Sequence, residues 1–207
     1  MRLSQYRQIV RVLTTAALAS SCAGVEPSGY LKNTPLLSKG HFLDLVYRTP
    51  SFNVNRYKTL ALHVEPSFNF PSDGFSIKGL NSYLGSNLAD RFRETGAFSE
   101  VTSNPDTATS PPNNSLICSV AITQMDSGNR TLRWFFGEFG AGHTVIQVEG
   151  KMTDVRTGEE LMSFIENRRG AAVTDITGGD SQGLLEQDLR EISDRIVKEV
   201  LFGASGS

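Results

Sequence analysis

The stretch that decides the fold is TVIQVEGKMTDVRTGEELMSFIENR, residues 144–168. In its first half the side chains alternate: Ile146, Val148, Gly150 and Met152 face one way, and Gln147, Glu149, Lys151 and Thr153 face the other. This alternation predicts a strand from Thr144 to Val155 with one face buried and one face toward water. The next residues place Gly158 at a turn position, and Asp154 is predicted to stabilise that turn. A second strand is predicted from Glu160 to Arg168, so the stretch predicts an antiparallel hairpin.

Two helices are predicted from apolar side chains that recur every three or four residues. The clearer helix runs from Ser181 to Leu201 and carries the stripe Leu185, Leu189, Ile192, Ile196 and Val200. Its acidic residues gather early and Lys198 comes late, which suits the helix dipole, and we interpret the acids as a solvated face. The other helix runs from Ser76 to Thr95 and ends at Gly96. Gly79 and Gly85 weaken it, and we expect that these glycines permit close packing on a sheet.

Three further strands complete the expected sheet. They are predicted at residues 56–65, 98–102 and 116–125, and in the first of them Leu60, Leu62 and Val64 share one face. The resulting order, β-α-β-β-β-β-α, predicts a single α/β (α+β) domain. We expect a mostly antiparallel sheet of about five strands with both helices packed on one face.

The N-terminus predicts export. Arg2, Arg7 and Arg11 precede an apolar run of eight residues, which is too short to span a bilayer and is typical of a signal peptide. Residues 18–22, LASSC, resemble a lipobox, the processing site of bacterial lipoproteins. In such signals the cysteine, here Cys22, becomes the first mature residue and carries acyl chains. Cleavage by ordinary signal peptidase is the alternative.

These features divide the chain into four expected parts. A signal peptide occupies residues 1–21, a lipidated tether and N-terminal arm residues 22–56, an α/β periplasmic domain residues 57–203, and a disordered tail residues 204–207. The tether is expected to reach about Gly29. By resemblance to proteobacterial sorting signals, Ala23 implies delivery to the outer membrane, with the domain facing the periplasm.

Charge and cysteine content exclude some functions. The net charge is −2, and removal of the three signal arginines leaves about −5, which argues against a nucleic-acid surface. The only cysteine besides Cys22 is Cys118, so no disulfide framework is expected. Cys118 lies in a strand-like run, where a lone cysteine behaves as a small buried hydrophobe; a reactive thiol is the alternative.

The segment NRTLRWFFGEFGAGH, residues 129–143, is the candidate functional site. Aromatic side chains beside arginine are typical of interface anchors, and the candidate partner-binding residues are Arg130, Arg133, Trp134, Phe135, Phe136 and Phe139. Three interpretations stay open: a long hairpin loop whose aromatics pack back onto the sheet, a surface for a partner or for self-association, or a contact with lipid head groups. The glycine spacing fits neither a dinucleotide-binding motif nor a P-loop.

Residues 130–142 resemble the R-x-L-R-W-x-x-G-x-G-x-G segment of uncharacterised bacterial lipoproteins grouped as a domain of unknown function. Residues 153–164, TDVRTGEELMSF, resemble the strand-turn-strand of that group. Short segments at 28–31, 57–60 and 65–66 resemble a sister family. A looser similarity in element order extends to the periplasmic domains of curli-secretion-type lipoproteins. The resemblance implies a periplasm-facing α/β domain anchored in the outer membrane, and it implies no reaction.

The sequence offers no catalytic pattern. The three histidines, His41, His63 and His143, lack the spacing of a helical zinc site, and the carboxylates follow no catalytic motif. We therefore expect no enzyme, cofactor or metal, but an accessory module that binds its membrane through the anchor and binds an envelope protein or itself. An envelope hydrolase using Cys118 or a carboxylate is one alternative, and an oligomeric secretion or pore accessory is the other.

Overall fold

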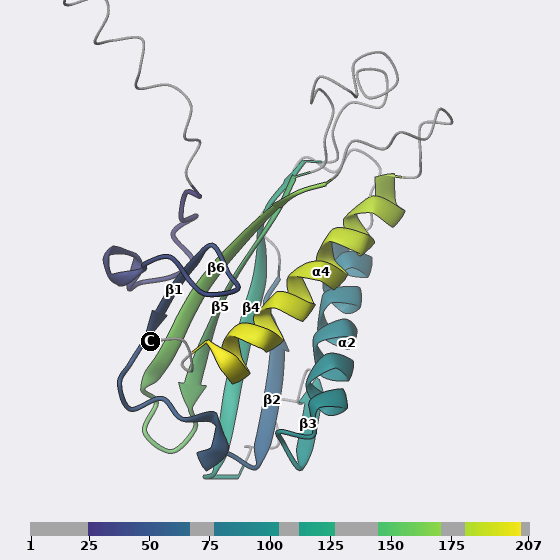
Figure 1. Ribbon diagram of the computed structural model, residues 1–207. Helices are drawn as coiled ribbons and strands as arrows, with labels where there is room; N and C mark the ends of the chain where they lie inside the picture. The colour runs from purple at the N-terminus through teal and green to yellow at the C-terminus, as the bar shows by residue number, and fades with distance from the viewer. Residues whose placement is uncertain (1–24, 67–76, 104–111, 127–144, 171–180, 204–207) are drawn as a thin grey trace, which may run out of the picture.

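In the computed structural model of the protein, the predicted hairpin is present (Figure 1). The structure describes residues 25–66, 77–103, 112–126, 145–170 and 181–203. Strands β5 (Val145–Asp154) and β6 (Glu160–Arg169) pair antiparallel, with Gly150 opposite Phe164. At the turn, the Asp154 carboxylate accepts hydrogen bonds from the Arg156 and Thr157 N–H groups at 2.8 and 2.9 Å. Gly158 has φ +69°, a conformation that favours glycine. Both turn predictions are confirmed.

Four more strands and two α-helices complete the fold. The strands are β1 (Leu45–Arg48), β2 (Thr59–Val64), β3 (Glu100–Ser103) and β4 (Ser115–Asp126), and the helices are α2 (Ile77–Thr95) and α4 (Ser181–Phe202). Two short 3-10 helices, η1 (Thr34–Leu36) and η2 (Val54–Arg56), lie in the N-terminal segment. The sheet order is β1-β6-β5-β4-β2-β3, and both α-helices cover one face (Figure 1).

The predicted α+β class, the two helices and their order along the chain are confirmed from β2 onward. Two features of the sheet differ from the prediction. It has six strands, because β1 joins it by pairing antiparallel with β6. It is also mixed, since β2 runs parallel to both of its neighbours, β3 and β4. A long connection through α2 separates β2 from β3, and parallel pairing needs such a crossover.

The core lies between the sheet and the two helices. From β2, Leu60 and Leu62 face the helices and are buried, as their alternation predicts. Leu80, Leu84, Leu88 and Phe92 of α2 and the stripe of α4 are buried against the same face. Each such leucine stabilises the fold by roughly 1.5–3 kcal/mol. Gly85 of α2 makes the close approach that we expected, because a Cβ there would lie 2.9 Å from Val64 Cγ2.

The other face of the sheet, which we call the outer face, is covered by residues 25–37. Gln147 and Glu149 of β5 lie on this face, and their exposed fractions are only 1% and 0%. The prediction that this side of the strand faces water is therefore wrong for these two residues, whereas Lys151 and Thr153 are partly exposed. The two faces of the strand alternate as predicted, but the N-terminal segment lies over the outer face and contributes Leu31 to the buried residues.

Residues 38–57 continue along the edge of the sheet and into the core. Leu43, Val46, Phe52 and Val54 are buried there. The N-terminal segment is thus built into the domain over its whole described length, and we call residues 25–57 the arm. Within the described ranges, neither α-helix is apolar enough over a sufficient length to cross a bilayer.

Candidate functional site

The candidate residues from the sequence fall outside the described structure. Arg130, Arg133, Trp134, Phe135, Phe136 and Phe139 all lie in residues 127–144, and Cys22 precedes residue 25. The structure does place the two ends of the first segment. Asp126 ends β4, Val145 begins β5, and the two residues are paired partners, so residues 127–144 connect two adjacent antiparallel strands.

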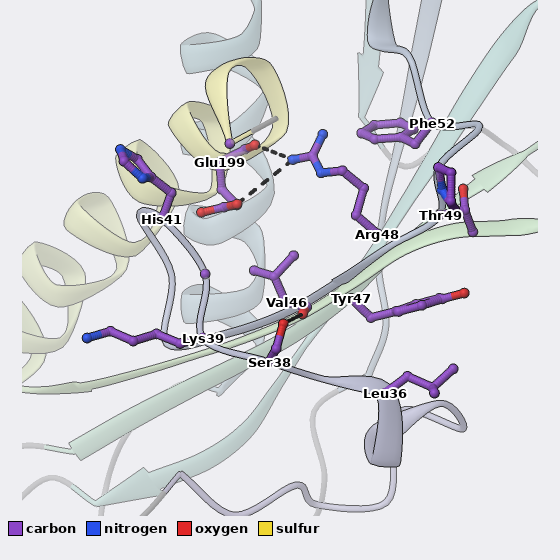
Figure 2. Close-up of a pocket in the computed structure, with 13 residues that line it drawn as sticks. Leu36, Ser38, Lys39, His41, Val46, Tyr47, Arg48, Thr49, Phe52 and Glu199 are labelled. Atoms are coloured by element: carbon purple, nitrogen blue, oxygen red, sulfur yellow. Dashed lines mark hydrogen bonds and ion pairs between the residues drawn. The ribbon is translucent and has the colours of Figure 1, made fainter. Parts of the chain in front are cut away.

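A hollow of about 440 Å³ lies where the arm meets the C-terminal end of α4 (Figure 2). Residues 36–52 of the arm supply most of its lining, and α4 supplies Glu199, with Gly203 just beyond it. Position 203 has no room for a side chain, because a Cβ there would lie 2.6 Å from the Glu199 carbonyl oxygen. The hollow is therefore formed by two segments about 150 residues apart in sequence.

Glu199 is the central side chain of this hollow. Its carboxylate oxygen Oε2 accepts hydrogen bonds from the backbone N–H groups of Phe42 and Leu43, at 2.6 and 3.3 Å. The residue is 2% exposed. A buried carboxylate needs such partners, because its transfer from water is otherwise strongly unfavourable. Glu199 thus holds the arm to α4.

Arg48 of β1 points toward Glu199 (Figure 2). Its Nη2 atom donates to the Glu199 carbonyl oxygen at 2.5 Å and lies 3.9 Å from the carboxylate. The guanidinium also lies over the Phe52 ring, 4.9 Å from its centroid. Burial lowers the pKa of Arg48, and the Glu199 charge acts against that decrease. The two charges offset each other inside the hollow, while Lys39 and His41 are exposed at its rim.

A second buried carboxylate, Glu166 of β6, joins three elements. Its Oε1 lies 2.9 Å from Arg195 Nη1 of α4, and its Oε2 accepts from the Asp44 N–H of the arm at 3.0 Å. The Asp44 carboxylate in turn accepts from the Asn167 N–H at 2.9 Å. Burial and the nearby Asp44 charge raise the pKa of Glu166 to about 7, against the opposite influence of Arg195 and Arg168.

A third buried carboxylate, Glu149, holds the start of the arm on the outer face. Its Oε1 accepts from the Ser28 N–H at 2.7 Å and from the side chains of Thr123 and Gln147 at 3.0 Å each. The Gln147 side chain also donates to the carbonyl oxygen of Glu26 at 3.0 Å. All three carboxylates therefore accept backbone N–H groups of the arm, and such charge-assisted hydrogen bonds are the strong ones.

The cysteine and the histidines of the described structure are not arranged as the catalytic groups of a hydrolase would be. Cys118 is fully buried on the helix-facing side of β4, and burial raises the pKa of its thiol to about 12, so the reactive thiolate is suppressed. His63 lies 3.5 Å from Glu65 at the surface, and His41 packs edge-on against Phe42. His143 lies outside the described residues. Within the described ranges, no three His, Cys, Asp or Glu residues come together as a metal site.

Sequence reasoning missed Glu149, Glu166 and Glu199 as structural groups. The signal was present for Glu199, which sits beside Ile196 and Val200 of the apolar stripe and so falls near the buried side of the helix. Asp188 is likewise 4% exposed and lies 3.4 Å from Arg168. The interpretation of the helix acids as a solvated face is therefore wrong for these two residues.

Part of the chain matches a known protein family. Residues 61–174 match the family described as Domain of unknown function (DUF4410), a range that runs from within β2 to beyond the end of β6. No curated protein matches the chain.

The chain is also similar, at a low level, to several solved structures. The PelC dodecamer from Paraburkholderia phytofirmans is 17% identical, with TM-score 0.40, over 70% of this chain and 96% of that chain. A Xanthomonas campestris protein described under DUF330 is 13% identical, with TM-score 0.42, over 76% and 91%. A lipoprotein from Neisseria meningitidis is 16% identical, with TM-score 0.39, over 68% and 98%. At this similarity we transfer no function from them.

Proposed function

The chain belongs to the family described as Domain of unknown function (DUF4410), and we propose that it is a lipid-anchored, non-enzymatic binding module of the bacterial cell envelope. In this proposal residues 1–21 are removed and Cys22 carries the acyl chains. The arm and the α/β domain then face the periplasm from the outer membrane, and residues 204–207 form a tail. Anchoring would confine the domain to one surface and so raise its effective concentration for partners there.

The observation that carries this proposal is the attachment of the arm. The residues that follow Cys22 join the fold from Glu26 onward, through Gln147 and Glu149. An anchor at Cys22 would therefore hold the folded domain itself at the membrane, with only a short connection between them. The non-enzymatic part of the proposal is supported by Cys118, whose thiol is buried, and by the buried carboxylates, which hold the arm.

Mass spectrometry and membrane fractionation of the full chain test the anchor. We expect acyl chains on Cys22 and recovery of the protein with membranes, and we expect Cys22→Ser to move it to the soluble fraction. Cys118→Ala is the matched control, because it removes the other cysteine and leaves the anchor. A mature N-terminus with a free thiol at Cys22 would refute the proposal.

For the binding function, residues 130–143 stay the proposed contact, with Arg130, Arg133, Trp134, Phe135, Phe136 and Phe139 as its anchors. Crosslinking from this segment in intact cells, followed by identification of the attached protein, tests it. A Trp134→Ser, Phe136→Ser double variant that folds normally but loses the crosslink supports a partner surface. A variant that fails to fold instead indicates that the aromatics pack on the sheet. Attachment only to further copies of this chain indicates self-association.

A further inference from the structure

The arm reaches the sheet very soon after Cys22. Its first contacts are the hydrogen bond from Gln147 Nε2 to the carbonyl oxygen of Glu26, at 3.0 Å, and the one from the Ser28 N–H to Glu149, at 2.7 Å. Leu31 is buried a few residues later. Only four residue steps therefore separate Cys22 from a fixed point of the folded domain.

Four residues cannot reach far. A fully extended chain spans at most about 3.3–3.6 Å per residue, so Glu26 can lie no more than about 14 Å from Cys22. If Cys22 carries acyl chains in the bilayer, Glu26 stays within about that distance of the membrane surface. A flexible tether of some 20 residues would have an average span near 25 Å and would leave the orientation of the domain free.

The fixed point lies on one particular side of the molecule. Gln147 and Glu149 belong to the outer face, whereas α2 and α4 cover the opposite face of the sheet (Figure 1). The helix layer adds about 10–12 Å beyond the sheet. The helices therefore lie on the side of the sheet opposite Glu26.

We propose that the arm-covered outer face, around Glu26 and Lys32, lies against the bilayer that holds Cys22, and that α2 and α4 face away from it. This inference rests on the proposed lipidation. The occupant of the face is the lipid surface itself, because the chain between Cys22 and Glu26 is too short for a protein to fit between them. Glu26 and Lys32 are exposed and carry opposite charges, so the short connection and not electrostatic attraction fixes the orientation.

Site-specific quenching in liposomes tests this orientation. A fluorophore is attached to Lys32→Cys on the arm or to Ser86→Cys on the exposed side of α2, in the lipidated full chain with Cys118→Ala. The liposomes are phosphatidylcholine with a nitroxide on a fraction of the head groups. We expect at least twofold quenching at position 32 and none at position 86. Inserting 20 Gly and Ser residues after Val25 should abolish that difference while the arm stays attached.

The outcomes separate this inference from the proposed function. Flotation with liposomes reports the anchor, and the quenching pattern reports the orientation. Equal quenching at the two positions, or stronger quenching at position 86, in a chain that floats would overturn the orientation and leave the anchor intact. A chain that does not float overturns both.

Discussion

Replacing Glu199 by glutamine tests how strongly the buried carboxylate holds the arm. Glutamine has the same shape, so the substitution removes the charge without opening a cavity. The two hydrogen bonds from Phe42 and Leu43 then change from charge-assisted to neutral, and each loses about 1 kcal/mol of stabilisation. Arg48, whose side chain is 18% exposed, loses its ion partner, which destabilises the fold by about 1 kcal/mol more. We expect the free energy of unfolding to fall by about 3 kcal/mol.

Urea unfolding followed by circular dichroism measures this loss on the mature chain. For a chain of this size it corresponds to a decrease in Tm of about 6–12 °C. The matched control is Glu186→Gln on the same helix, where the side chain accepts an exposed hydrogen bond from Gln182, and we expect a change below about 0.5 kcal/mol. Amide exchange of Phe42 and Leu43 gives the local readout and should accelerate in Glu199→Gln alone. A loss no larger than the control, or unchanged exchange at these two amides, would refute the reasoning.

Three further predictions concern other buried groups. Gly150→Ala should lower stability by about 1–3 kcal/mol in a thermal melt, because the new Cβ would lie 2.8 Å from Phe164 Cε2. The thiol of Cys118 should resist a thiol reagent at pH 8 in folded Cys22→Ser protein and react fully in denaturant, since its pKa is about 12; full reaction in the folded state would contradict this. Glu166 has a pKa of about 7 in the fold, above its ordinary 4.5, so the folded state binds the proton more tightly and this group's contribution to stability falls as pH rises from 4.5 to 7. The slope of this contribution to the free energy of unfolding against pH approaches about 1.4 kcal/mol per pH unit. Urea titrations at a series of pH values measure it, and Glu166→Gln should remove it. An unchanged slope in that variant would count against the shifted pKa.

Most of the sheet and both α-helices follow from local patterns. The alternation of β5, the turn at Gly158 and the stripe of α4 are each visible within one window of sequence. Strand β1 is not, because it is four residues long and its segment is broken by proline and glycine on either side. Its place in the sheet depends on pairing with β6, more than 110 residues away. The parallel pairing of β2 likewise depends on the path of the chain through α2.

The candidate site was harder to predict, because the sequence gives the right face for Glu149 but not what covers that face. A carboxylate on the polar side of an alternating strand is expected to meet water. Here it meets the N–H of Ser28, which is 121 residues distant in sequence. A backbone N–H is present at every residue except proline, so no side-chain pattern in the arm announces such a bond. Sequence reasoning identified the aromatic segment 129–143 because side chains carry its signal, and the structure does not describe that segment.

The use of carboxylates to hold the arm also bears on how the arm and the domain evolve together. Glu149, Glu166 and Glu199 each accept backbone N–H groups from the arm, and recognition of this kind depends on the path of the chain more than on its side chains. The arm can therefore change most of its residues and stay attached, provided that proline does not replace a donor. Loss of one of the three carboxylates, by contrast, leaves the opposing N–H groups without that acceptor. The constraint that keeps the arm attached to the domain thus resides in the strands and in α4.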